Sequence, residues 1–247
     1  MKITVLGTSH GVPGADRFCS STMIEIGDAV YLVDGGAPTG DLLIREGIDY
    51  DRIKAVFTTH IHGDHTLGML GMLSLSNWKF RTSSYVTYMA TEEGIEAFKK
   101  VIEVTDAPLD ETRLTMKVTE PGTFYDDGVL RVTAIPTRHM EAAGKPTYAL
   151  VLEAEGKRVI FTGDLHGQDA ADFPQIAKDE PSDLIICEMA HFGHETIIPI
   201  AASCPTKMLM FNHVWWKYEE SMAGIKAADG KYAMPIVAVE DGDIYEL

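Results

Sequence analysis

The sequence predicts an α/β protein in which two β-sheets pack face to face with helices on the outside. Short β-type runs recur along all 247 residues, and amphipathic helical patterns lie between some of them. Hydrophobic residues make up 45% of the chain, which is enough to build a sizeable core. Because no linker, repeat or low-complexity segment interrupts the sequence, we expect one domain over residues 1–247.

Twelve β-type runs are expected to form the strands of these sheets. Most are rich in β-branched or aromatic residues and end at turns that contain Gly, Pro or Asp. In chain order they are Ile3–Leu6, Thr22–Ile26, Val30–Val33, Ala55–Thr58, Tyr85–Tyr88, Leu114–Val118, Leu130–Ile135, Tyr148–Leu152, Val159–Thr162, Leu184–Cys187, Met208–Phe211 and Ile236–Val239.

Three segments between the strands have the spacing of helices, namely Thr66–Leu75, Glu92–Val104 and Glu219–Ala228. The second has the clearest pattern, because its apolar residues recur at three- and four-residue intervals. The apolar residues that should face the core are Ile95, Phe98, Val101 and Ile102. Thr91 is the expected N-cap, since its hydroxyl can accept a hydrogen bond from a free amide of the first turn.

The charge balance bears on the partners of the protein. The chain has 37 acidic and 21 basic residues, which gives a formal net charge of −16. This charge is unfavourable for binding along the phosphate backbone of a nucleic acid, where a basic surface is expected. A compact substrate, or an anion bound through metal ions, remains compatible with this charge. We therefore expect a small-molecule substrate and no nucleic-acid partner.

The remaining composition predicts a cytoplasmic protein without membrane spans. The N-terminal residues 1–7 read as a strand entering a turn rather than as a signal peptide, and no apolar run approaches membrane-spanning length. The cysteines Cys19, Cys187 and Cys204 are far apart and show no metal or redox spacing. We expect them to be reduced thiols in the core.

The run His60-Ile61-His62-Gly63-Asp64-His65 carries the strongest functional signal in the chain. It places three imidazoles and one carboxylate within six residues. Imidazole nitrogens and carboxylate oxygens are ligand types that suit zinc, manganese and iron. We therefore interpret the run as part of a metal site rather than as a histidine-rich polar loop.

Further residues of the ligand types stand where β-type runs end. They are Asp34, His139, Asp164 and His213. A single His or Asp after a strand is usually a turn residue or a cap. Together with His60–His65, however, the ordered series favours a metal centre whose ligands are held by strand ends, while the loops leave room for a substrate.

This ordered series resembles the metallo-β-lactamase fold superfamily, and the resemblance spans essentially the whole chain. It implies a four-layer αββα sandwich with two divalent metal ions at one edge; Zn²⁺ is expected, and Mn²⁺ or Fe are the alternatives. By this resemblance the first ion is bound by His60, His62 and His139, and the second by Asp64, His65 and His213. Asp164 would bridge both ions, and Asp34 would orient the histidine loop through hydrogen bonds.

The flanking residues resemble the ribonuclease Z-like branch of this superfamily. The matching stretches are Leu6–Ile26, Ile53–Leu73 and Asp183–Ala202. In that branch, the His of a Gly-His-x-Thr element donates a proton and contacts the scissile phosphate. His194 matches that His, so the resemblance implies that His194 and Asp64 are the catalytic residues. Lactam hydrolysis is disfavoured, because true β-lactamases usually lack a His after the motif Asp and often carry a Cys in place of the bridging Asp.

Two departures separate the chain from relatives that process tRNA. Those enzymes carry a protruding basic arm, whereas only 24 residues separate His139 from Asp164 here, and they read as two strands joined by a turn at Gly156. The basic N-terminal loop is also weakened, since it keeps Arg17 but adds Asp16. The arm-lacking relatives, including the cyclic phosphodiesterase of phosphonate catabolism, are closer in architecture. The expected substrate is a small nucleotide-like or cyclic phosphodiester.

Four other functions fit part of the pattern. A thioesterase or lactonase could use the same metals as Lewis acids on a carbonyl. Ribonuclease Z-like RNA processing would use the metals on a large phosphodiester. A di-iron redox centre is disfavoured, because such proteins usually carry a fused flavin domain. A non-catalytic metal-stabilised binding protein is disfavoured, because the ligand set is complete.

Several residues near the motifs are candidates for substrate contact. The predicted substrate-binding residues are His10, Arg138 and His191. The structural alternatives are an exposed turn position for His10, an ion pair for Arg138 and a place in a pocket wall for His191. His166 could support the metal site or lie on the surface. The tryptophans are Trp78, Trp215 and Trp216. We expect them to pack in the core or on a dimer surface rather than to line the cleft. A homodimer is an option by analogy with the relatives alone.

Overall fold

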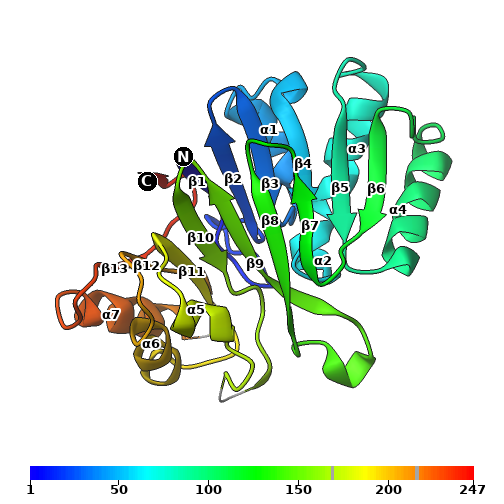
Figure 1. The fold of residues 1–247 in the computed structure, drawn as a ribbon. Coiled ribbons are helices and arrows are strands. Elements are labelled where there is room, and N and C mark those ends of the chain that lie inside the picture. The colour runs from blue at the N-terminus through cyan, green and yellow to red at the C-terminus, as the bar shows by residue number, and fades with distance from the viewer. Residues whose placement is uncertain (168–169, 215–216) are drawn as a thin grey trace. The chain divides into compact units, whose positions relative to one another are not determined.

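The computed structural model describes residues 1–167, 170–214 and 217–247. The chain forms two compact units, each with its own β-sheet (Figure 1). Unit 1 comprises Met1–Gly7, Gly11–Thr119 and Asp241–Glu246, and unit 2 comprises Thr8–His10, Glu120–Glu240 and Leu247. The prediction of a single domain stays a prediction.

Unit 1 contains a seven-stranded mixed sheet in the order β14-β1-β2-β3-β4-β5-β6. Strands β3 to β6 are parallel neighbours, and β14, β1, β2 and β3 pair antiparallel. Its strands are β1 (Lys2–Gly7), β2 (Ser21–Ile26), β3 (Ala29–Val33), β4 (Ile53–Phe57), β5 (Tyr85–Met89), β6 (Leu114–Val118) and β14 (Ile244–Glu246). Because the carboxyl ends of parallel strands meet at one edge, the segments after β3 and β4 come together.

Unit 1 contains the helices α1 (Thr39–Arg45), α2 (Gly63–Thr66), α3 (Gly68–Trp78) and α4 (Glu92–Thr105), with a short 3₁₀ turn η1 (Tyr50–Arg52) (Figure 1). Helices α1, α3 and α4 pack apolar side chains with the sheet in one core. Leu43 of α1, Met72 of α3 and Ile102 of α4 are almost fully buried with strand residues such as Leu32 and Val56. Each such burial stabilises the unit by about 1.5–3 kcal/mol.

Helix α4 follows the predicted amphipathic pattern, with one exception. The Thr91 hydroxyl accepts a hydrogen bond from the Gly94 amide at 3.1 Å, which confirms the predicted N-cap. Ile95, Phe98 and Ile102 are buried, but Val101 is 41% exposed. The prediction for Val101 was wrong because its side chain points roughly a quarter-turn away from the centre of the buried face in a helix of 3.6 residues per turn.

Unit 2 contains the second seven-stranded sheet, in the order β13-β12-β11-β10-β9-β8-β7. Strands β10 to β13 are parallel, whereas β7 to β10 pair antiparallel. Its strands are β7 (Gly122–Asp126), β8 (Arg131–Thr137), β9 (Thr147–Ala154), β10 (Lys157–Phe161), β11 (Leu184–Met189), β12 (Leu209–Val214) and β13 (Ile236–Ala238). This pattern brings the carboxyl ends of β8, β10, β11 and β12 to the same edge.

The helices of unit 2 share a separate core with this sheet. They are α5 (Gln175–Asp179), α6 (His194–Ala202) and α7 (Tyr218–Ala228), with a 3₁₀ turn η2 (Glu141–Ala143). Ile197 of α6 and Ile225 of α7 are fully buried against strand residues such as Ile185 and Phe211. Figure 1 shows α6 and α7 beside one another, at the side of the sheet that carries β12 and β13.

The twelve predicted strands are confirmed, with boundary shifts of a few residues. The predicted helix Thr66–Leu75 is instead two helices, because α2 ends at Thr66 and α3 begins at Gly68. At this break Gly68 approaches the Gly36 backbone so closely that a Cβ on Gly68 would lie 2.3 Å from the Gly36 oxygen. Among the described helices, none is long and apolar enough to cross a membrane.

The predicted core location of the cysteines is confirmed. Cys19, Cys187 and Cys204 are buried and not in disulfides. Burial, followed by the charge of neighbouring Glu188, raises the pKa of the Cys187 thiol well above its ordinary value. Thiols in such surroundings are chemically inert packing groups.

Candidate metal centre

The histidine run of unit 1 forms a loop that is docked on the turn after β3. The Gly35 amide donates to the His65 carbonyl at 2.7 Å, and a Cβ on Gly36 would lie 2.0 Å from the Asp64 carbonyl oxygen. Only glycine permits this close approach of two backbones. The residues after β3 and β4 are thereby locked together at the edge where these parallel strands end.

Asp34 orients this loop as predicted. Its Oδ1 accepts a hydrogen bond from the Thr59 amide at 2.8 Å, and its Oδ2 accepts from Nδ1 of His65 at 2.8 Å. The Thr59 hydroxyl lies 3.0–3.1 Å from both Asp34 oxygens and 3.0 Å from Nδ1 of His60. Asp34 adopts a left-handed backbone with φ of 58°, a strained conformation that is typical of functional sites.

The ligand-type side chains of this loop fall into two pairs. Nε2 of His60 lies 3.0 Å from Nδ1 of His62, and Nε2 of His65 lies 3.6 Å from Oδ2 of Asp64. Two nitrogen ligands of one tetrahedral zinc ion are separated by about 3.3 Å, since each Zn–N bond is about 2.0–2.1 Å. The spacing in each pair therefore suits two ligands of the same ion.

In unit 2 the predicted ligands gather at the edge where β8, β10 and β12 end. His139 follows β8, Asp164 follows β10, and His213 is the penultimate residue of β12. Oδ2 of Asp164 lies 3.7 Å from Nε2 of His139 and 3.4 Å from Nε2 of His213. One carboxylate oxygen of Asp164 thus stands near a histidine of each of the two predicted ligand sets.

The hydrogen bonds of these histidines fix which nitrogen faces Asp164. Nδ1 of His139 donates to the Leu165 carbonyl at 3.3 Å, and Nδ1 of His213 donates to the Ser9 carbonyl at 3.1 Å. A neutral imidazole with its proton on Nδ1 presents the lone pair of Nε2. His213 also has a left-handed backbone, with φ of 53°, which sets the direction of its ring.

The donor chemistry of both units fits divalent metal ions. Nδ1 of His65, like that of His139 and His213, is bonded to an oxygen acceptor, an arrangement usual for metal-binding histidines. Asp164 and His65 are buried, so the carboxylate and imidazole groups are held in place rather than solvated. Neutral imidazoles combined with carboxylates suit zinc, and also manganese or iron.

Two supporting carboxylates in unit 2 were not recognised from the sequence. Asp172 accepts hydrogen bonds from the amides of Arg138 (2.6 Å) and His166 (2.9 Å), so it ties the His139 segment to the Asp164 turn. Glu188 of β11 is buried and accepts from the Leu165 amide at 2.8 Å. A carboxylate inside an otherwise apolar strand is the one signal that could have revealed Glu188.

The other predicted residues of unit 2 are placed as follows. His194 is the first residue of α6. Its ring packs against Gly224, because a Cβ on Gly224 would lie 2.2 Å from the His194 ring. Nε2 of His194 lies 3.3 Å from Oε1 of Glu195. His191 lies with its ring centroid 4.6 Å from that of His139. The Arg138 guanidinium is 47% exposed and 4.0 Å from Glu141.

Of the remaining predicted residues, His10 belongs to a short segment beside β12. Its neighbour Ser9 forms a parallel bridge with Val214. The tryptophans divide into Trp78, which ends α3 and is 57% exposed, and Trp215 with Trp216, which lie outside the described residues. Of the two placements expected for Trp78, the core is excluded because the helix end carries the side chain to the surface, and dimer packing stays a prediction.

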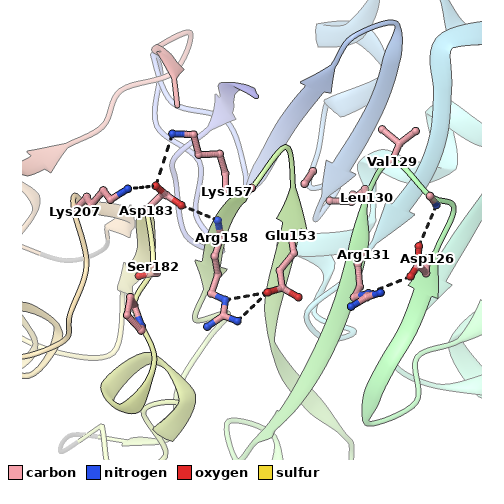
Figure 2. A pocket seen from close by; sticks show the side chains of 14 residues that line it. Asp126, Val129, Leu130, Arg131, Glu153, Lys157, Arg158, Ser182, Asp183 and Lys207 are labelled. Atoms are coloured by element: carbon pink, nitrogen blue, oxygen red, sulfur yellow. Dashed lines mark hydrogen bonds and ion pairs between the residues drawn. The ribbon is translucent and has the colours of Figure 1, made fainter.

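A separate hollow of about 700 Å³ lies at the opposite ends of the strands of unit 2 (Figure 2). Its cations pair with carboxylates: Lys207 contacts Asp183 at 2.7 Å, and Arg158 contacts Glu153 at 2.9 Å. Arg131 likewise pairs with its neighbour Asp126 (Figure 2). Lys157 shares Asp183 with Lys207. Because each cation that lines the hollow is paired with a carboxylate, and no histidine is among the described residues that line it, the hollow does not offer the groups that the predicted chemistry needs.

Solved structures share this fold. The metallo-β-lactamase fold protein YhfI from Bacillus subtilis matches with a TM-score of 0.79 and 20% identity, over 100% of this chain and 99% of that chain. The short form of human tRNase Z matches with a TM-score of 0.75 and 19% identity, over 100% and 99%. A diphosphatase from the PhnP family matches with a TM-score of 0.72 and 19% identity, over 100% of this chain and 97% of that chain. The protein therefore has the metallo-β-lactamase fold, as predicted, and is of the α/β class.

Sequence comparisons place the chain more narrowly. The model of the family described as Anti-Pycsar protein Apyc1 matches residues 1–207, and the chain belongs to this family. Ribonuclease Z of Listeria innocua is 32% identical over 146 residues, which are 56% of this chain and 46% of that protein. Ribonuclease Z of a Picosynechococcus species is 28% identical over 145 residues, which are 58% of this chain and 45% of that protein. The chain spans about half the length of the curated relatives that it matches.

Proposed function

We propose that this protein is a dinuclear-metal-dependent phosphodiesterase that acts on a small nucleotide-like or cyclic phosphodiester. The observation that carries the proposal is the position of Asp164. Its Oδ2 lies 3.7 Å from His139 Nε2 and 3.4 Å from His213 Nε2, as a carboxylate shared by two ions would. The similarity to Ribonuclease Z supports phosphodiester chemistry.

The two donor sets are proposed to form one centre, and the chain itself supports this. Ser9 accepts a hydrogen bond from His213 within unit 2. Within unit 1, Gly11 lies against the Asp64 carboxylate, since a Cβ on Gly11 would be 3.6 Å from its Oδ2. Ser9 and Gly11 are two residues apart, so their Cα atoms are separated by at most about 7 Å. His213 and Asp64 are thus tethered to neighbouring points of one loop.

In the proposed centre each ion would be held by two residues of unit 1, one histidine of unit 2 and Asp164. The first ion would be held by His60, His62 and His139, and the second by Asp64, His65 and His213. We propose Zn²⁺, because histidines and carboxylates in sets of this size suit it. Two bound ions would polarise a phosphoryl oxygen, lower the pKa of water and stabilise the attacking and leaving oxygens.

Three residues are proposed to act on the substrate beside the metal ions. Arg138 precedes His139 and exposes a guanidinium that can bind a phosphoryl group through two parallel hydrogen bonds. His10 stands between the two residues that contact His213 and Asp64. His194 is proposed to donate the proton that an alkoxide leaving group needs, as its match in the ribonuclease Z-like branch implies.

We propose a small substrate because the net charge of the protein and the short segment between His139 and Asp164 are both unfavourable for binding a large polyanion. The net charge of −16 repels a nucleic-acid backbone. The segment between His139 and Asp164 contains β9 and β10, joined at Gly156 with φ of 72°. It therefore has no room for a protruding RNA-binding arm.

A hydrolysis screen of the zinc-loaded protein tests this proposal. We expect turnover of bis-p-nitrophenyl phosphate and of cyclic nucleotides, and little turnover of a thioester, a lactone or a synthetic tRNA precursor. The Asp164→Ala variant serves as the control for contaminating hydrolases, because it should lose every activity that depends on the shared ligand.

Each other outcome of the screen points to a different function. Preferred turnover of the thioester or lactone would replace the phosphodiesterase with carbonyl hydrolysis at the same ligands. Accurate and efficient cleavage of the tRNA precursor at physiological salt would contradict the proposed substrate size. That result would make RNA processing, the alternative that the similarity to Ribonuclease Z suggests, the better account.

A further inference from the structure

The buried carboxylate of Glu188 holds several groups in the part of unit 2 that carries Asp164. Glu188 has only 3% of its side chain exposed. Its Oε1 accepts hydrogen bonds from the Leu165 amide and from Nδ1 of His191, both at 2.8 Å. Its Oε2 accepts from the amides of Ala190 at 2.7 Å and His191 at 3.1 Å. Since a carboxylate offers about four lone-pair positions, the capacity of Glu188 is filled.

This saturation decides which role Glu188 can have. Asp164, Glu188 and His191 offer ligand-type atoms within 4.8 Å of one another, which alone would suit a further metal site. However, N–H groups occupy the positions of Glu188 that an ion would need. A buried carboxylate that loses one of its partners is strongly destabilised, so these four bonds cannot be exchanged at little cost. Glu188 therefore orders its hydrogen-bond donors rather than binding a ligand.

The donors belong to two segments of functional interest. Leu165 directly follows Asp164, so its bond to Glu188 fixes the turn that carries the proposed shared ligand. His191 is held through both its amide and Nδ1, which fixes the direction of its ring. That ring lies 4.6 Å from the ring of His139, and the His191 side chain keeps 28% of its area exposed. Nε2 is the ring nitrogen that Glu188 does not hold.

We propose that Glu188 is a positioning residue of the metal centre, which holds the Asp164 turn and aims Nε2 of His191 at a phosphoryl oxygen of the bound substrate. This inference rests on the proposed function and adds to it the arrangement that orients one substrate contact. His191 is the residue that touches the substrate, whereas Glu188 acts through His191 and Asp164.

Three variants of the full chain test this arrangement. Glu188→Gln keeps the size of the side chain but replaces one acceptor oxygen with an amide that faces N–H donors. His191→Phe keeps a ring against His139 but removes both nitrogens. Asp183→Asn is the matched control, because Asp183 precedes the same strand at its other end and accepts from the Arg158 amide at 2.9 Å and from Lys207 at 2.7 Å.

Three properties of each variant are measured. Chelator competition gives the affinity for zinc, and calorimetry gives the affinity of the zinc-loaded protein for inorganic phosphate. Steady-state kinetics with bis-p-nitrophenyl phosphate give KM and kcat. Glu188→Gln should lower zinc affinity by about 10–100-fold, as expected for groups that orient metal ligands, and should weaken phosphate binding. His191→Phe should keep zinc affinity near wild type, weaken phosphate binding by about 10–100-fold and raise KM. Asp183→Asn should change none of these.

The positioning role is contradicted if Glu188→Gln matches Asp183→Asn in both zinc and phosphate affinity. Unchanged phosphate affinity and KM in His191→Phe would contradict the substrate contact, and this variant decides the matter if Glu188→Gln does not fold. Failure of the proposed function looks different, because the wild-type protein would then bind no zinc or would hydrolyse no phosphodiester.

Discussion

Asp164→Ala is expected to weaken the binding of both metal ions and to abolish phosphodiester hydrolysis. The reason is that Asp164 Oδ2 stands near His139 and His213, one from each proposed ligand set. A shared ligand contributes to two ions, so the loss of affinity should exceed the roughly 10–100-fold typical of residues that only orient ligands. Elemental analysis and the rate with bis-p-nitrophenyl phosphate measure the two effects.

Single-ligand variants provide the comparison for Asp164→Ala. His139→Ala should weaken the first ion and His213→Ala the second, each leaving the other ion more firmly bound. Asp183→Asn again serves as the control, since its carboxylate lies at the amino end of β11, opposite the ligands. Retention of both ions and of the full rate by Asp164→Ala would show that Asp164 is not the bridge.

His194→Ala is expected to lower turnover by a factor on the order of 10²–10⁴ for substrates whose leaving groups have a high pKa. Such leaving groups need a proton, and His194 is proposed to supply it. The side chain is 22% exposed at the start of α6, and its Nε2 lies 3.3 Å from the exposed Glu195. Metal content should stay near wild type, because His194 lies outside both ligand sets.

The ratio of mutant to wild-type rates across leaving groups of graded pKa measures this role. Substrates with a p-nitrophenolate leaving group need little protonation and should lose much less activity than those with an alkoxide. A uniform loss across the series would mean that His194 positions the substrate instead. His191→Phe gives a useful contrast, because loss of a phosphoryl contact should depend little on the leaving group.

The strands of this fold could be predicted because their residues repeat a strong local pattern. The run Leu184–Cys187, for example, is apolar and β-branched, and it lies in the buried strand β11. Strand β7 was missed because Gly122–Asp126 is exposed or only partly buried at the sheet edge. Strand β14 was missed because its three residues at the edge of the other sheet are also exposed or only partly buried. Helix α1 was missed because it follows Pro38 without a side-chain hydrogen bond to mark its start.

The candidate ligands could be predicted, whereas most of their supports could not. His139 and Asp164 are visible in the sequence because they follow predicted strands. The Ser9 carbonyl that holds His213 comes from 204 residues away and is a backbone atom, which leaves no sequence signal. Asp172 likewise acts across 34 residues on the Arg138 amide, a contact created only when the loops come together.

The number of metal ions per chain tests the central claim most directly. The seven proposed ligands would divide into two sets of three with Asp164 shared, and the distances within each unit are compatible with that proposal. Elemental analysis of protein purified gently and then exposed to excess zinc should give close to two ions per chain. A stoichiometry fixed at one ion under these metal-replete conditions would contradict the dinuclear centre.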